Sequence, residues 1–295
     1  MPTRRTFLAT TAATALARSA FAGDASAESE SNSICVFTKP FQSLTFDELA
    51  QQTAAVGFGG IEAPIRPGGH IEPEAVPDKL PELVESLRKQ NLKLTVLTSN
   101  INDASDPITE SVLSTTASLG IRYYRMQYFK YDEGKSITKQ IDQWNRRMKD
   151  LAALNKQLGI TGVYQNHAGR NYFGAAIWDL HRGLDGIDPN DIGVAYDIRH
   201  AAVEAGMSWP INFQLIRDHV QVVYVKDFTW GESGLTNVPL GQGEVDPNFF
   251  SMLKKANFRG PISLHQEYID HRNPKLVPQH WAAIKSDFQT LKFWL

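Results

Sequence analysis

Cysteine is nearly absent from this chain of 295 residues, which has only Cys35. A single cysteine excludes an intramolecular disulfide, so the fold must be stabilised by its core alone. Cys35 lies in the apolar run SICVFT, where we expect a small buried side chain rather than a nucleophile.

An excess of either charge is also lacking. The chain has 30 Lys and Arg against 32 Asp and Glu, a formal net charge of -2, with no basic tract or acidic tail. Nucleic-acid binding depends on clustered positive charge, so nucleic acid is not expected as a partner. No segment offers the roughly 20 consecutive apolar residues that span a bilayer, so no membrane association is expected either.

The first residues resemble a processing signal rather than part of a fold. TRRTFLA (3–9) places two arginines before two apolar residues, and an Ala/Thr-rich stretch and small-x-small sites at 20–22 and 25–27 follow. This order predicts a twin-arginine signal peptide and short linker over residues 1–27, with a short amphipathic anchor as the alternative. The mature protein is then expected in the periplasm or secreted.

Short apolar runs alternate with helical patterns through the remaining residues, 33–295. The runs cover 33–38, 59–65, 92–98, 121–127, 160–165, 192–197, 220–226 and 261–267. Eight strand–helix units predict an α/β fold, a (β/α)₈ TIM barrel in a single domain. A doubly wound open sheet is the alternative, but no glycine-rich dinucleotide turn follows the first run.

Polar residues collect where the predicted strands end, which is where TIM barrels place their active sites. They are Lys39, Arg66, His70, Thr98, Ser99, Gln127, Tyr131, Gln165, His167, Asp197, His200, Lys226, Asp227, His265 and Glu267. Because side chains alternate along a strand, Gln165 and His167 share one face. By the same rule Lys226 and Glu267 point into the barrel, either as a buried ion pair or as part of a polar pocket suited to a sugar.

Several motifs at these strand ends are typical of one group of enzymes. They are GFGGIEAPIRPGGHIEP, YQNHAG, YDIRHA, YVKDFTW, PLGQGEVDPNFF and GPISLHQEY. With them the chain resembles the xylose-isomerase-like TIM barrels, the sugar phosphate isomerase/epimerase group, from about Ile34 to its end. RPGGH, KDFTW and LHQEY look like an exported subgroup of that family.

The resemblance implies a metal site that this sequence keeps only in part. Many members bind one divalent ion through Glu, Asp, His and Glu after strands five to eight, and these positions fall on Gln165, Asp197, Tyr224 and His265. If one divalent ion binds (Zn²⁺, Mn²⁺ or similar), Gln165, Asp197 and His265 are its expected ligands. In the alternative the metal is absent and Lys226 supplies the positive charge.

The expected activity is that of an exported isomerase or epimerase, which transfers a proton on a sugar or keto-sugar. Such chemistry needs a base and a group that stabilises an enediolate oxygen. Glu267 is the expected base, with its pKa raised by desolvation, and Lys226 and His167 are the expected stabilisers of the oxyanion.

Further side chains are expected to bind the small-molecule partner, a sugar or glycoside. They are Lys39, Arg66, His70, Gln127, His200 and Trp230. A lyase or hydrolase acting on 3-keto-glycosides and a non-catalytic sugar-binding barrel are the alternatives, and the sequence leaves the oligomeric state open.

Overall fold

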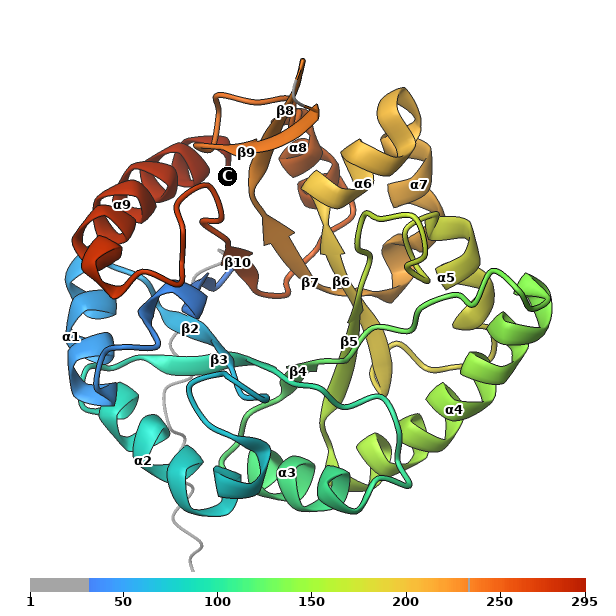
Figure 1. Ribbon diagram of the computed structural model, residues 1–295, viewed down its shortest axis with the longest axis horizontal. Coiled ribbons are helices and arrows are strands. Elements are labelled where there is room, and N and C mark those ends of the chain that lie inside the picture. The colour runs from blue at the N-terminus through green and yellow to red at the C-terminus, as the bar shows by residue number, and fades with distance from the viewer. Residues whose placement is uncertain (1–31, 233) are drawn as a thin grey trace, which may run out of the picture. The chain divides into compact units, whose positions relative to one another are not determined.

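The structure, a computed structural model, describes residues 32–232 and 234–295, and its centre is a barrel of parallel strands (Figure 1). The barrel closes in the order β1-β10-β7-β6-β5-β4-β3-β2. Its strands are β1 (Ile34–Phe37), β2 (Gly60–Pro64), β3 (Lys93–Thr98), β4 (Tyr123–Arg125), β5 (Thr161–Gln165), β6 (Ile192–Asp197), β7 (Val220–Val225) and β10 (Ile262–Leu264). Each lies within one of the eight apolar runs, so the (β/α)₈ prediction is confirmed. The expected signal peptide, residues 1–27, lies outside the described residues.

Helices surround the barrel, as the alternating pattern predicts (Figure 1). They are α1 (Phe46–Val56), α2 (Val76–Arg88), α3 (Pro107–Ser118), α4 (Ile137–Leu158), α5 (Ile177–Gly183), α6 (Ile198–Ala205), α7 (Trp209–Ile216), α8 (Asn248–Lys255) and α9 (Val277–Trp294). Local sequence determines where they begin and end. Thr45 and Glu48 form a capping box at the start of α1, and Gly57 ends that helix with a left-handed φ of 98°.

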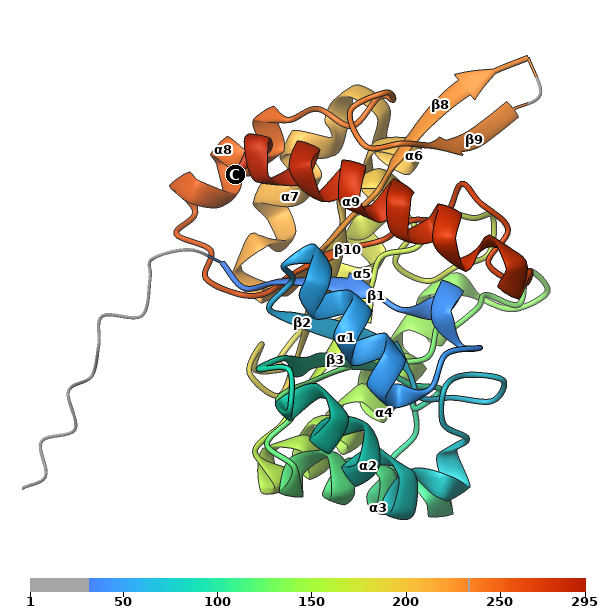
Figure 2. The same ribbon diagram turned by 90° about the vertical axis from the view of Figure 1, so that its left-hand side faces the viewer.

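Short 3-10 helices and one hairpin complete the unit. The 3-10 helices lie at Lys39–Phe41, Pro73–Ala75, Gly206–Ser208, Arg217–His219 and Pro274–Leu276. Strands β8 (Asp227–Gly231) and β9 (Gly234–Val238) pair antiparallel and extend away from the barrel (Figure 2). The apolar pattern does not predict this hairpin, although Gly231 and Gly234 flank its turn.

A small apolar layer fills the middle of the barrel. It consists of Val96, Val163, Ala195, Val222 and Tyr224. Because strand side chains alternate, the next inward residues along these strands are polar ones, such as Gln165, Asp197 and Lys226. The apolar layer therefore closes the barrel directly beneath a polar layer at the carboxyl ends of the strands.

Cys35 is completely buried, as the sequence predicts, and burial raises the pKa of its thiol to about 12. Its thiolate is therefore strongly disfavoured, which argues against a nucleophilic role. Among the described helices, none is both long and apolar enough to cross a membrane.

Candidate active site

A pocket of about 200 Å³ opens at the carboxyl ends of the barrel strands. Its lining residues are Phe37, Lys39, Glu62, Arg66, Arg125, Tyr128, Gln165, His167, Lys226, His265 and Glu267. The structure thus brings together seven residues that the sequence analysis selected: Lys39, Arg66, Gln165, His167, Lys226, His265 and Glu267. They come from both halves of the barrel, which is why their convergence tests the predicted topology.

Lys226 lies at the centre of the charged contacts in this pocket. Its Nζ is 3.2 Å from Oδ2 of Asp197 and 3.2 Å from Oε2 of Glu267. Burial disfavours the charged ammonium, but the two carboxylates outweigh it and raise the pKa of Lys226. Lys226 is therefore charged at neutral pH. An ammonium has three N–H donors, so one remains available for a ligand.

The charge of Glu267 differs from the sequence-based expectation. Burial does raise the pKa of this carboxyl group, but the Lys226 ammonium outweighs burial and holds the pKa well below its usual range. The expectation of a raised pKa was therefore wrong, because it counted desolvation without the paired cation. Glu267 is ionised at any ordinary pH.

Gln165 connects Asp197 to the other side of the pocket. Its Nε2 donates to Oδ2 of Asp197 at 2.8 Å. Its Oε1 accepts hydrogen bonds from the Tyr128 hydroxyl and from Nη1 of Arg125, the latter at 3.3 Å. A glutamate at this position could not donate to Asp197 and would add a like charge beside it, so these contacts require an amide.

These contacts do not fit the metal site that the resemblance implies. The oxygens of Asp197 face the Lys226 ammonium, the Gln165 amide and the backbone N–H of His200 (3.1 Å), and Nε2 of His265 is held by Glu62 at 2.9 Å. Over residues 32–232 and 234–295, no group of three or more His, Cys, Asp and Glu side chains is arranged to hold a metal ion. Gln165, Asp197 and His265 are therefore not a converging ligand set, and Lys226 occupies the cationic position beside Asp197.

Glu62 is a pocket residue that the sequence analysis missed. This fully buried carboxylate on β2 accepts hydrogen bonds from Thr98, from Ser263 (2.7 Å) and from His265 (2.9 Å). Burial alone would raise its pKa, but these partners, with His265 first, lower it. The available signal was a single charged residue within the apolar run GGIEAPI, since a buried charge always needs partners.

His167 has a defined tautomer. Its Nδ1 lies 2.8 Å from the carbonyl oxygen of Ala168, which can only accept, so the proton is on Nδ1 and Nε2 carries a free lone pair. Burial, reinforced by the Lys226 charge, lowers its pKa to about 4. At neutral pH His167 is therefore a hydrogen-bond acceptor and a base. It cannot donate to an oxyanion through Nε2, contrary to the role expected from the sequence.

His200 lies behind the pocket rather than in its lining. Its Nδ1 accepts from Nη1 of Arg199 at 3.0 Å, and its Nε2 faces Oδ2 of Asp197 at 3.5 Å. The rings of His200 and His167 are 4.0 Å apart. Its contacts position Asp197 and His167, so the structure gives it a supporting role in place of the expected substrate contact.

Three other expected substrate contacts lie outside the pocket lining. Nε2 of His70 bonds to the carbonyl oxygen of Thr38 at 3.1 Å, Gln127 has an exposed side chain, and Trp230 on the hairpin is 55% exposed. Gln127 misses the pocket because β4 ends at Arg125, two residues before the end of the predicted strand. Arg125 and Tyr128 line the pocket instead.

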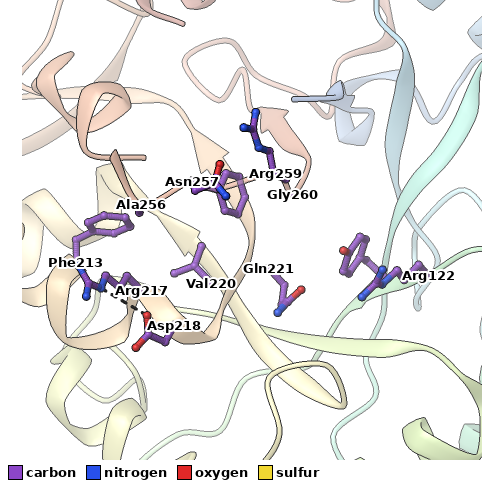
Figure 3. Close-up of a pocket in the computed structure, with 12 residues that line it drawn as sticks. Arg122, Phe213, Arg217, Asp218, Val220, Gln221, Ala256, Asn257, Arg259 and Gly260 are labelled. Atoms are coloured by element: carbon purple, nitrogen blue, oxygen red, sulfur yellow. Dashed lines mark ion pairs between the residues drawn. The ribbon is translucent and has the colours of Figure 1, made fainter. Parts of the chain in front are cut away.

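A larger cavity of about 410 Å³ lies near the amino ends of β4, β7 and β10 (Figure 3). Its lining includes Arg122, Phe213, Val220 and an ion pair between Arg217 and Asp218, whose atoms are 3.5 Å apart. That ion pair is exposed to solvent, and the amino end of a TIM barrel contributes to stability rather than to chemistry. The smaller pocket is therefore the candidate active site.

The barrel and its polar carboxyl end define a protein of the TIM-barrel class. The family model for xylose isomerase-like TIM barrels matches residues 50–286, and the chain belongs to this family. No curated protein sequence matches the chain significantly.

Several solved structures share the fold. A D-allulose 3-epimerase from Methylomonas sp. is 17% identical, with a TM-score of 0.67 over 90% of this chain and 98% of that chain. A 3-keto-D-glucoside 4-epimerase from E. coli is 15% identical, with a TM-score of 0.63 over 86% and 99%. A probable 3-DHS dehydratase from Bacillus anthracis is 13% identical, with a TM-score of 0.67 over 89% and 99%. At these identities the likeness is one of fold.

Proposed function

We propose that this protein is a carbohydrate-active enzyme that transfers a proton next to the carbonyl group of a sugar or keto-sugar, as isomerases and epimerases do. The observation that carries the proposal is the buried Lys226 ammonium, 3.2 Å from both Asp197 and Glu267 in a pocket of about 200 Å³. This volume is below the roughly 300–1,000 Å³ of sites for drug-sized ligands, which suits a single sugar unit.

Lys226 supplies the electrophile in this proposal. Two of its N–H groups face Asp197 and Glu267, and the third donates to the carbonyl oxygen of the substrate. When a proton leaves the neighbouring carbon, negative charge develops on that oxygen, and a fixed, buried ammonium stabilises it. The pair of carboxylates keeps the ammonium charged and in place.

Glu267 and His167 are the two groups able to remove the proton. Both line the pocket and both are in their basic forms at neutral pH, Glu267 because of Lys226 and His167 because of burial. Glu267 is the base in our proposal, since it contacts the electrophile directly, and His167 is a second acceptor for a substrate hydroxyl or proton.

The shared basic form of these two groups also favours a second candidate, β-elimination from a 3-keto-glycoside. Epimerisation by two groups needs one of them protonated, whereas elimination begins with a base alone. In that reaction the base takes the proton from C2, the bond between C1 and the glycosidic oxygen breaks, and the proton passes to the departing alcohol. A sugar-binding barrel without catalysis is the remaining alternative.

Hydrogen exchange with solvent tests the proposal. We would incubate the protein in D₂O with ketoses, 3-keto-glycosides and sugar acids that carry a keto group, and follow deuterium at the carbon beside the carbonyl by NMR. We expect exchange with at least one of them, unchanged after exhaustive chelation and lost in Glu267→Gln. Binding of these sugars without exchange or product would instead assign the protein as a binding barrel.

A further inference from the structure

Three cations in the candidate pocket form no close ion pair with any described carboxylate. Lys39, Arg66 and Arg125 all line it, yet within the described parts of the chain none of them forms an ion pair. Arg125 is buried and has one weak hydrogen bond, to Gln165 at 3.3 Å, and the face of the Tyr128 ring 4.8 Å from its guanidinium carbon. Lys39 and Arg66 have no side-chain hydrogen bond to any described residue.

The nearby carboxylates contact other donors and cations. Asp197 and Glu267 share Lys226, and Glu62 is held by Thr98, Ser263 and His265. Burial lowers the pKa of Lys39 and of Arg66, and Arg125 lowers that of Arg66 further. Glu267 opposes the shift of Lys39, and Tyr128, Tyr224, Glu62 and Glu267 outweigh burial and raise the pKa of Arg125, although no described carboxylate forms an ion pair with these cations. Unpaired charges held together at such a cost in free energy indicate a ligand of opposite sign.

The three cations lie on one arc of the barrel. Lys39 follows β1, Arg66 follows β2 and Arg125 ends β4, and these strands are neighbours in the order β1-β2-β3-β4. His167, Lys226 and Glu267 follow β5, β7 and β10 on the opposite arc. The pocket therefore has one arc with three cations beside the carboxylate of Glu62, and one arc with a base and an electrophile, and the two arcs meet where β1 pairs with β10.

We infer that the substrate is a sugar acid, whose carboxylate binds Lys39, Arg66 and Arg125 while its carbonyl oxygen faces Lys226. This rests on the proposed function. Two guanidinium groups match a carboxylate through parallel N–H donors. The pocket of about 200 Å³ confines both ends to one monosaccharide unit, so the carboxylate and the carbonyl belong to the same sugar.

Binding measurements with three probes test the inference. Calorimetry would compare D-glucuronate with neutral D-glucose and with D-glucose 6-phosphate, at low and high salt. We expect the carboxylate to bind about 10–100-fold more tightly than the neutral sugar, as charge-assisted hydrogen bonds imply, and less tightly as salt rises. Equal affinity for the neutral sugar, or a preference for the phosphate, would overturn the inference.

Variants localise the effect. Arg66→Gln and Lys39→Gln should each lose most of the preference for the carboxylate while keeping the wild-type melting temperature, because both side chains are only half-buried. Arg170→Gln, in an exposed pair with Glu133, is the matched control and should change nothing. A preference retained in Arg66→Gln and in Lys39→Gln would contradict the assignment.

The two proposals can fail separately. Preference for the acid without deuterium exchange would refute only the proposed function, and exchange on neutral ketoses alone would refute only this inference.

Discussion

Glu267 and Lys226 form a buried pair that serves either chemistry or structure. In the catalytic case Glu267→Gln should lower turnover by about 10²–10⁴-fold, the usual contribution of a general base, and leave KM nearly unchanged. The variant should stay folded, since Lys226 keeps Asp197 as its partner. Turnover measured on a substrate found by the deuterium assay checks this. Full activity in the folded variant would remove Glu267 from the mechanism.

Lys226→Met tests the same two alternatives, chemistry or structure, by removing the cation of the pair. It leaves the carboxylate of Asp197 buried without its cation, so we expect a loss of about 3–5 kcal/mol in the free energy of unfolding together with loss of turnover. Pairing it with Asp197→Asn should restore stability but not activity. Recovery of activity in the double variant would show that Lys226 is structural.

The lowered pKa of His167 predicts how kcat/KM changes at acid pH. Its pKa is lowered to about 4, so it is neutral and basic above that pH, and protonation below it removes the lone pair of Nε2. We expect kcat/KM to be constant from about pH 5 upward and to fall as the pH drops through about 4. His167→Gln should abolish this limb, whereas His181→Gln on the surface should keep it. An unchanged limb in His167→Gln would assign it to another group.

Alternation alone predicts which strand residues point into the barrel, but not how their pKa values are shifted by the partners they meet there. Period-two spacing was enough to expect Gln165, Lys226 and Glu267 in one pocket. The metal expectation considered the ligand positions without the Lys226 ammonium beside Asp197. Spacing along one strand says nothing about this contact between a residue of β6 and a residue that follows β7. For the same reason the pKa of Glu267 was expected in the wrong direction.

Asp227 organises the segment between the hairpin and α8. Its carboxylate accepts hydrogen bonds at 2.9–3.0 Å from the backbone N–H groups of Phe228, Gly241, Gly243 and Val245. A side chain at residue 243 would collide with this carboxylate and with the Phe228 carbonyl, which explains the second glycine of PLGQGEVD. The sequence places Asp227 at a strand end, but three of its four donors lie 14, 16 and 18 residues away and could not be foreseen.

Removing that carboxylate should therefore affect both stability and the site. Asp227→Ala leaves four backbone N–H donors without their acceptor. We therefore expect a loss of at least about 3 kcal/mol in the free energy of unfolding, measured by denaturant titration. Asn237 on the same hairpin bonds to Arg199 (2.9 Å) and to the Glu267 carbonyl (3.3 Å), so turnover should fall too. Asp246→Ala, which removes one exposed bond to Asn248, should have a much smaller effect. Equal losses in the two variants would contradict this role.

Asp179 on α5 should make stability depend on pH. Burial raises its pKa to about 6, although its carboxylate accepts from Tyr131 (2.7 Å) and Gly174 (2.9 Å). Because the folded pKa exceeds the unfolded one, the stabilising effect is complete below about pH 4 and disappears as the pH rises through 6. At pH 8 the Asp179→Asn variant should therefore be more stable than wild type, by up to about 2 kcal/mol in the free energy of unfolding, and should melt at a higher temperature. At pH 4 this difference in stability should disappear. A gap independent of pH would contradict it.

At the scale of the whole molecule the eight-unit barrel followed from sequence because apolar runs and amphipathic helices alternate without interruption. The hairpin β8–β9 was missed because its first strand continues directly from β7. A barrel whose described part, 32–232 and 234–295, has one cysteine, fully buried, needs no oxidising compartment to reach its native state. Its native state can therefore form in a reducing compartment.

We propose that the protein is exported in this folded form through the pair Arg4 and Arg5. Replacing both by lysine should retain the full-length precursor in the cytoplasm, because a twin-arginine signal is read by its two guanidinium groups and lysine keeps only the charge. Arg18→Lys, in the same segment, is the matched control and should be processed normally. Cell fractionation with immunoblotting measures both the size and the location of the product. If the doubly substituted chain reached the periplasm as well as the control did, residues 1–27 would not act as a twin-arginine signal, and the substrates would have to be sought among sugars inside the cell as well.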